Sequence, residues 1–228
     1  KMKKDQTLGE SLREQGVSRR SFLKFCAATA SMMALPPSMI PVIASTLEKA
    51  RRPSVIWLSF QECTGCTESI TRSSSATIED LIFNAISLDY HHTLQAASGD
   101  AAEAAREAAM EENHGKYVLV VDGSIPTANP GYSTIAGISN VDMLKDTAAG
   151  AAAIVAVGSC AAFGGIPKAN PNPTGAVSVS DLITDKPIIN VPGCPPIPAV
   201  ITGVLVQFLT FGLPELDDLG RPAAFYGQ

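Results

Sequence analysis

Short apolar runs, separated by helix-forming stretches, are the feature that most constrains how this chain can fold. Five of them occur after residue 53, at 55–58, 84–88, 117–121, 153–157 and 188–191. Runs this short and this continuously apolar are typical of strands buried on both faces of a parallel sheet. Parallel neighbours need long crossover connections, which are usually helical. We therefore predict an α/β fold, a flavodoxin-like doubly wound parallel sheet with helices on both faces.

The segments between these runs have the composition of the crossover helices. Residues 94–112 are rich in Ala and Glu, both of which favour helix, and further helices are predicted at 141–149 and 197–211. Residues 66–82 are predicted to hold one or two helices. The sequence Asn-Pro-Asn-Pro-Thr-Gly at 170–175 is predicted to be a loop, because proline at every second position excludes a helix.

Composition excludes several broad classes of protein. Of the 228 residues, 46% are hydrophobic and 17% are charged, which is typical of a globular chain and not of a disordered or coiled-coil one. The formal net charge is −5, so no broad basic surface is available for a phosphate backbone. We therefore expect no nucleic-acid partner.

The first 44 residues differ from the rest in charge and pattern. They carry a net charge of +4, against −9 for the remainder. The sequence Ser-Arg-Arg-Ser-Phe-Leu-Lys at 18–24 precedes a mildly apolar stretch and has the twin-arginine export pattern. Prolines at 36, 37 and 41 argue against a membrane-spanning helix. We predict a twin-arginine signal peptide at 1–44, with a basic flexible arm as the alternative, and a mature domain at 45–228.

The boundary of this leader follows from small residues at its end. Cleavage after Ala44 fits a signal peptidase, and Ala50 is a second candidate. Twin-arginine export carries folded proteins, usually ones that acquire a cofactor before export. Cys26 lies within the leader and is therefore interpreted as an apolar residue and not as a ligand.

The other four cysteines all follow predicted strands. Cys63 and Cys66 come after the first strand, Cys160 after the fourth and Cys194 after the fifth. The carboxyl ends of parallel strands lie along one edge of a sheet, where open α/β folds bind their ligands. We therefore expect the four thiols to converge there, although they are far apart in sequence.

Four cysteines without a nearby histidine suit either an iron–sulfur cluster or structural zinc. A glycine lies next to, or one residue away from, the Cys63–Cys66 pair, Cys160 and Cys194. Because glycine has no side chain, it lets the backbone approach a bulky inorganic core. Structural zinc usually uses paired Cys-x-x-Cys knuckles, whereas this chain has one pair and two single cysteines, so the spacing favours iron–sulfur. A redox-active disulfide between Cys63 and Cys66 would leave the other two unexplained.

Four motifs together resemble a known family. They are Glu-Cys-Thr-Gly-Cys-Thr-Glu at 62–68, Gly-Ser-Cys at 158–160, Asn-Pro-Asn-Pro-Thr at 170–174 and Val-Pro-Gly-Cys-Pro-Pro at 191–196. In this order and at these separations, the chain resembles the small subunit of nickel–iron uptake hydrogenases. The resemblance implies that Cys63, Cys66, Cys160 and Cys194 bind the proximal [4Fe-4S] cluster. It implies no catalytic residue in this chain, and it gives Glu62 a role at the subunit interface or in proton movement.

The resemblance also implies partners and a location. Electrons from H2 oxidation in a nickel–iron large subunit would pass through this chain to a cytochrome or another electron acceptor. Export by the twin-arginine machinery would place it in the periplasm, associated with the membrane through its partners. The family's carboxyl-terminal domain holds a medial [3Fe-4S] and a distal [4Fe-4S] cluster. No further cysteine or histidine follows Cys194, so we expect that domain to be missing here.

Two alternatives remain beside this interpretation. The related cluster subunit of respiratory complex I shares the fold and the Pro-Gly-Cys-Pro motif but has adjacent cysteines where this chain has Cys63-x-x-Cys66. The second alternative is a zinc-stabilised binding module.

Oxygen-tolerant hydrogenases have extra cysteines at positions matching Gly65 and Gly165. Both positions are glycine in this chain, so the resemblance implies an ordinary, oxygen-sensitive four-cysteine cluster.

The histidines have no partner at metal-ligand spacing in the sequence. His91 and His92 follow the second predicted strand, and His114 lies at a predicted helix end. We expect all three at the surface or at helix ends.

Overall fold

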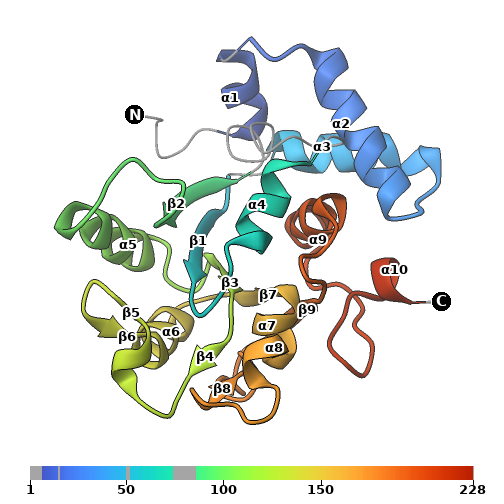
Figure 1. Ribbon diagram of the computed structural model, residues 1–228. Coiled ribbons are helices and arrows are strands. Elements are labelled where there is room, and N and C mark those ends of the chain that lie inside the picture. The colour runs from blue at the N-terminus through green and yellow to red at the C-terminus, as the bar shows by residue number, and fades with distance from the viewer. Residues whose placement is uncertain (1–6, 15, 50–51, 74–85, 228) are drawn as a thin grey trace.

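Five parallel strands form the sheet on which the rest of the chain is built (Figure 1). The computed structural model describes residues 7–14, 16–49, 52–73 and 86–227. The strands are β1 (Ser54–Ser59), β2 (Ser87–His91), β3 (Val118–Asp122), β7 (Ala153–Val157) and β9 (Ile188–Val191). Their order across the sheet is β2-β1-β3-β7-β9, with every neighbouring pair parallel. Numbered by sequence alone, this is the flavodoxin-like order 2-1-3-4-5, so the predicted fold is confirmed.

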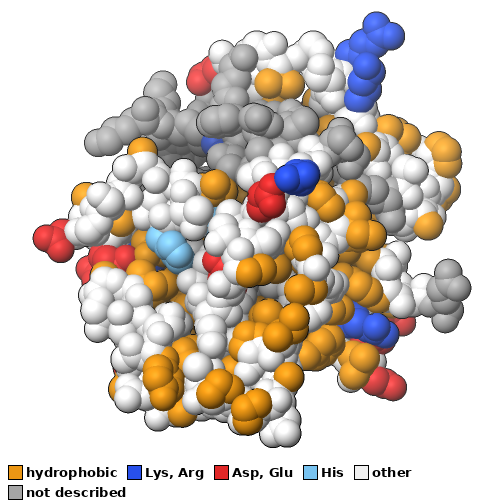
Figure 2. Space-filling view, in the orientation of Figure 1, with side chains coloured by type: hydrophobic (Ala, Val, Ile, Leu, Met, Phe, Trp, Pro, Cys, Tyr) orange, Lys and Arg blue, Asp and Glu red, His pale blue; other side chains and the backbone are white. Residues whose placement is uncertain are grey.

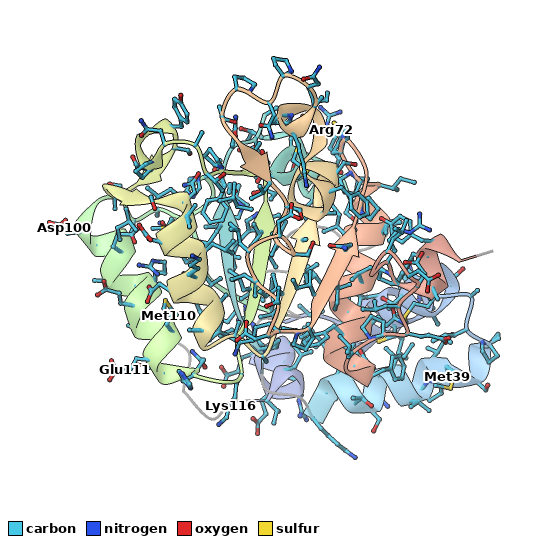
Figure 3. All side chains as sticks on the ribbon, turned by 90° about the horizontal axis from the view of Figure 1, so that it is seen from below. Met39, Arg72, Asp100, Met110, Glu111 and Lys116 are labelled. Carbon is cyan, nitrogen blue, oxygen red and sulfur yellow. The ribbon has the colours of Figure 1, made fainter. Side chains whose placement is uncertain are left out.

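Helices cover both faces of this sheet. In Figure 3, α5 (Asp100–Glu112) and α6 (Asn140–Ala149) lie on one side and α9 (Pro198–Phe211) lies on the other. Helix α4 (Gly65–Thr71) packs beside α9, while α7 (Gly158–Phe163) and α8 (Gly165–Lys168) follow β7 directly. The helix predicted at 94–112 begins only at Asp100, after Gly99 with a φ of +59°.

Alternate residues of each central strand enter two separate hydrophobic cores. In β1, Ile56 and Leu58 pack with α5 and α6, whereas Val55 and Trp57 pack with α4 and α9. All six residues of β1 and all five of β3 and β7 are buried. Burial on both faces is why these strands are continuous apolar runs in the sequence.

Four of the five predicted strands lie where the sequence places them, but the second does not. The runs at 153–157 and 188–191 match β7 and β9, and β1 and β3 differ by one or two residues at their ends. The second strand occupies 87–91 and not 84–88, because Asp89 and His91 are polar residues within it and hide its apolar pattern. Asp89 accepts hydrogen bonds from Ser54 and Ser87 at 2.5 and 2.6 Å. Residues 84–85, and the part of the predicted 66–82 helix after 73, lie outside the described residues.

Short elements complete the described part of the chain. Strands of two residues and helices of three or four residues are too short to give a periodic sequence signal, so they were not predicted. These elements are β4 (Ile125–Pro126) with β8 (Ala176–Val177), β5 (Thr134–Ile135) with β6 (Ile138–Ser139), η3 (Pro130–Tyr132) and α10 (Ala223–Tyr226).

The predicted leader segment is helical and packs beside α9. It forms α1 (Leu8–Glu14), α2 (Arg19–Met32), η1 (Pro37–Met39) and α3 (Ile40–Lys49), which stand together at the top of Figure 1. These helices have a hydrophobic core of their own, which α9 joins through Val206. Among the described residues, no helix is long and apolar enough to cross a membrane.

Candidate functional site

The four cysteines that follow strands line one pocket at the carboxyl edge of the sheet. Cys63 and Cys66 come from the loop after β1 and the start of α4, Cys160 from α7 after β7, and Cys194 from the loop after β9. Cys26 lies far away, in the core of the amino-terminal helices. The structure thus brings together the four thiols that the sequence singled out.

Hydrogen bonds between the loops fix the pocket walls. The Ser159 amide donates to the Gly193 carbonyl at 2.8 Å, and the Gly193 amide donates to Ser159 Oγ at 3.1 Å. Ser69 Oγ of α4 donates to the Pro196 carbonyl at 2.6 Å. Each single-cysteine segment is therefore tied to another wall, and the sulfurs do not depend on one flexible loop for their positions.

Glycines stand beside three of the sulfurs, where a side chain would collide with the sulfur or be tightly confined. Gly158 has a φ of +88°, and a β-carbon there would overlap Cys66 Sγ. Gly165 has a φ of +57°, and its β-carbon would lie 2.6 Å from Cys160 Sγ. At Gly65, the corresponding distance to Cys63 Sγ would be 3.2 Å. The sequence placed glycine near these cysteines, and the tertiary structure shows that the space a β-carbon would need is taken up by the sulfurs.

Burial and mutual repulsion disfavour ionised thiols in this pocket. The pKa of Cys66 is raised, first by burial and then by the charges of Asp122, Cys160 and Cys63. The pKa of Cys160 is raised as well, by burial and then by the charges of Cys194 and Cys63. Bound metal offsets this repulsion, because positive charge stabilises thiolates.

Glu62 lies on the rim of the same pocket. Its Oε1 accepts a hydrogen bond from Thr64 Oγ1 at 3.2 Å, and its Oε2 is buried without a hydrogen-bond partner in the described part of the chain. Burial, followed by the nearby charge of Asp122, raises the pKa of Glu62 to about 6. The carboxyl group is therefore poised to change protonation near neutral pH, and it has an oxygen free for a partner.

A buried polar group beneath α4 was missed in the sequence analysis. Asp122, the last residue of β3, is fully buried, and its Oδ2 accepts a hydrogen bond from Thr67 Oγ1 at 3.2 Å. Burial raises the pKa of Asp122, and the hydrogen bond from Thr67 offsets part of that effect. The contact ties the residue after Cys66 to the strand below. The Asp-Gly pair after an apolar run was the available sequence signal.

The predicted surface position of His91 is wrong. This residue ends β2 with 1% of its surface exposed. Its Nε2 lies 3.4 Å from Thr67 Oγ1, and its ring is tilted by 34° against the Trp57 ring, with 5.2 Å between the centroids. Burial, with a smaller effect from His92, lowers its pKa to about 4. The sequence could not reveal this, because the misplaced strand put His91 outside the sheet.

The chemistry of the donor set fits an iron–sulfur cluster. Four thiols from three walls face one pocket, and glycine backbones leave room beside three of the sulfurs. Among the described residues, no three His, Cys, Asp or Glu side chains are arranged around the position of a single metal ion. A cubane cluster differs from a single ion, since each of its thiolates binds a different iron.

The fold and this pocket define a class of protein: flavodoxin-like α/β domains with a four-cysteine site at the carboxyl edge of the sheet. Residues 63–208 match the family model described as NADH ubiquinone oxidoreductase, 20 Kd subunit. The matched segment begins at the first pocket cysteine and ends within α9.

Relatives of known sequence and structure narrow the class. The chain is 47% identical to the uptake hydrogenase small subunit of Azotobacter vinelandii, over all of this chain and 64% of that protein. It is 46% identical to the hydrogenase-1 small chain of Escherichia coli K12, over all of this chain and 62% of that one. It also superposes on a chain of the Ni-Fe-Se hydrogenase of Desulfomicrobium baculatum with a TM-score of 0.74 and 37% identity, covering 78% of this chain and 72% of that chain.

The chain belongs to the family described as NADH ubiquinone oxidoreductase, 20 Kd subunit, and the curated relatives above are hydrogenase small subunits. It spans less than two thirds of the length of the curated relatives above.

Proposed function

We propose that this chain is the iron–sulfur electron-transfer subunit of a nickel–iron hydrogenase. In this proposal Cys63, Cys66, Cys160 and Cys194 bind a proximal [4Fe-4S] cluster. The observation that carries it is the convergence of these four thiols on one glycine-lined pocket. The names of the relatives support a hydrogenase over a complex I-like quinone reductase, as does the Cys63-x-x-Cys66 spacing.

The residues of the pocket have separable tasks. When bound, the cluster supplies one-electron transfer between the partner's active site and an external acceptor. The four thiolates hold it, and the glycines against their sulfurs let the backbone approach closely. Thr67 fixes the Cys66 turn to Asp122. Glu62 is proposed to act at the subunit interface or in proton movement, because its buried Oε2 is available to a partner group.

The partner is proposed to be a nickel–iron large subunit that docks over the pocket. Apolar side chains that face solvent follow two of the cysteines: Phe163 and Ile166 come after Cys160, and Ile197 comes after Cys194, with 40%, 79% and 68% of their surfaces exposed. Hydrophobic side chains gather in the lower half of Figure 2, where Figure 1 places α7 and α8. Exposed apolar surface of this kind marks protein–protein contacts.

Residues 1–44 are proposed to be a twin-arginine leader that directs the folded subunit to the periplasm. The support is the motif at 18–24, in which Ser18 caps α2 and both arginines are exposed. We further propose membrane association through partner subunits and electron delivery to a cytochrome or another acceptor. The proposals on membrane association and electron delivery rest on the family resemblance of the cysteine motifs.

The cluster assignment is tested by metal analysis of the anaerobically purified chain. We expect about four irons and four acid-labile sulfides per chain, with an electron paramagnetic resonance signal after reduction. Cys160→Ser is expected to lose the normal cubane signal and most of the iron. Cys26→Ser is the matched control, because Cys26 is buried in another core, and it should keep both.

Two results would contradict the proposal. Zinc without sulfide in the purified chain would support a zinc-stabilised module instead. Unchanged iron content and an unchanged spectrum in Cys160→Ser would remove Cys160 from the ligand set. Hydrogenase activity is a poor readout for the isolated chain, since the nickel–iron site is proposed to lie in the partner.

A further inference from the structure

The outer face of α9 contacts the amino-terminal helices and not the sheet. Ile201, Val204 and Leu205 of α9 pack into the core under the sheet, whereas Val206 is fully buried among residues of α1, α2 and α3. Helices α2 and α3 both contact α9. Figure 3 shows the same arrangement, with Met39 marking the amino-terminal helices beyond α9. This face of α9 is therefore a docking surface, and the amino-terminal segment occupies it.

Helix α2 contributes a regular stripe to this contact. Phe22, Cys26 and Ala30, spaced four residues apart and so on one face of the helix, are at most 7% exposed. Arg19 and Arg20, by contrast, are exposed. The twin-arginine motif is thus divided in the docked state: its charged residues face solvent, and its phenylalanine is buried.

The predicted processing position is buried in the same contact. Ala44 lies in the middle of α3 and is 7% exposed, next to the fully buried Ile43. A peptidase needs an accessible, extended backbone at the bond it cleaves, and local opening must precede cleavage in a packed helix. The docked segment therefore hides its cleavage position as well as part of its recognition motif.

Polar atoms buried in these helices suggest that the contact is not a permanent core. Thr29 Oγ1 of α2, and Gln207 Oε1 and Thr210 Oγ1 of α9, are buried and accept or donate no hydrogen bond within the described residues. Thr29 is three residues from Cys26, and Gln207 and Thr210 flank the Val206 face. Buried polar groups without partners cost stability, and permanent cores rarely keep them.

We propose that residues 8–49 are a self-masking cover: docked on α9, they hide Phe22 and Ala44 from the export receptor and the peptidase, and they must undock before the signal is read and removed. The inference rests on the proposed twin-arginine leader and is independent of the cluster assignment. The partner that competes with α9 is the receptor for the twin-arginine motif.

Docking is tested by the reactivity of Cys26 in the purified full chain. Iodoacetamide labelling followed by peptide mass spectrometry reports Cys26 separately from the pocket cysteines. In Val206→Asp we expect Cys26 to be labelled at least ten times faster than in the wild type. Val42→Asp is the matched control, since Val42 lies on α3 with 47% of its surface exposed, and its rate should be that of the wild type.

A second variant guards against damage to α9 itself. Leu47→Asp places the charge on the α3 side of the contact, where Leu47 is 1% exposed, and leaves α9 unchanged. It should also accelerate labelling of Cys26, while hydrogen exchange of β3 amides stays as in the wild type. Equal labelling rates in the wild type and both variants would overturn the proposed docking.

Masking is tested by export and processing of the full chain in cells. The two undocking variants should be processed several times faster than the wild type, which keeps the residues before the cleaved bond unchanged. If Cys26 becomes reactive but processing is not faster, the mask is refuted. Replacement of both Arg19 and Arg20 by lysine tests the leader itself: normal export of that variant would refute the leader assignment, whereas protection of its Cys26 would still report docking.

Discussion

Gly158 lies directly against the sulfur of Cys66, although 91 residues separate them in the sequence. Gly158 begins α7 with a φ of +88°, a conformation that residues with a β-carbon rarely adopt. At the pocket, the contact joins the start of α4, which follows β1, to the start of α7, which follows β7. It makes the glycine a packing requirement of the site as well as a backbone requirement of the turn.

Gly158→Ala is therefore expected to lose most of its iron and to unfold at a lower temperature. Its matched control is Gly137→Ala, because Gly137 has a similar φ of +80° with open space around it. That control should cost about 1 kcal/mol from backbone strain and keep its iron. Iron analysis and thermal unfolding of the two variants separate the sulfur contact from the strain, and equal iron content in both would contradict the prediction.

Acid should destabilise the fold through His91. Because burial lowers the pKa of His91 to about 4 from 6.5, the imidazole stays neutral in the folded chain while it takes up a proton in the unfolded one. The free energy of unfolding should then fall as the pH drops from 6.5 towards 4, by on the order of 1 kcal/mol per pH unit. Above pH 6.5 this contribution is constant.

Chemical unfolding at several pH values checks this prediction in the wild type and in His91→Gln. The variant is expected to be less stable overall but to show a flatter dependence between pH 6.5 and 4. Glu62 and Asp122 titrate in the opposite sense, since their raised pKa values favour the folded state in acid, and their contribution is common to both proteins. Parallel curves would rule out His91 as the source.

Removal of the buried guanidinium between α5 and α6 should be costly. The Arg106 side chain is 2% exposed and pairs with Glu103 at 3.0 Å and Asp146 at 3.3 Å. Arg106→Ala leaves the mostly buried Glu103 without its cation, so we expect a loss of about 3 kcal/mol in unfolding free energy. Arg72→Ala breaks an exposed pair with Glu68 and should cost less than about 1 kcal/mol. Urea unfolding compares the two.

The proposed partner surface predicts a position-specific effect on assembly. Ile166→Glu places a charge on the exposed apolar surface after Cys160 and should reduce copurification with the large subunit at least tenfold. Leu213→Glu is the control: Leu213 is 52% exposed but follows the far end of α9, at the opposite edge of the sheet. Similar losses in both variants would argue against docking over the pocket.

Much of the fold could be predicted because its strands carry their own signal. Strands buried on both faces are continuous apolar runs, and two of them, β7 and β9, matched residue for residue. The convergence of the cysteines followed from topology, since each cysteine came after a strand and parallel strands share one carboxyl edge. The second strand failed because Asp89 and His91 interrupt the apolar pattern that local sequence rules depend on.

The sequence by itself determined four of the five central strands and which cysteines lie at the carboxyl edge of the sheet. Only the tertiary structure decided that His91 and Asp122 are buried beneath α4, that glycine backbones contact the sulfurs, and that α9 carries the amino-terminal helices on its outer face. The physical reason is that secondary structure follows from periodicity within a few residues. The burial of a polar side chain, or of a second helix face, depends on which distant segment packs against it.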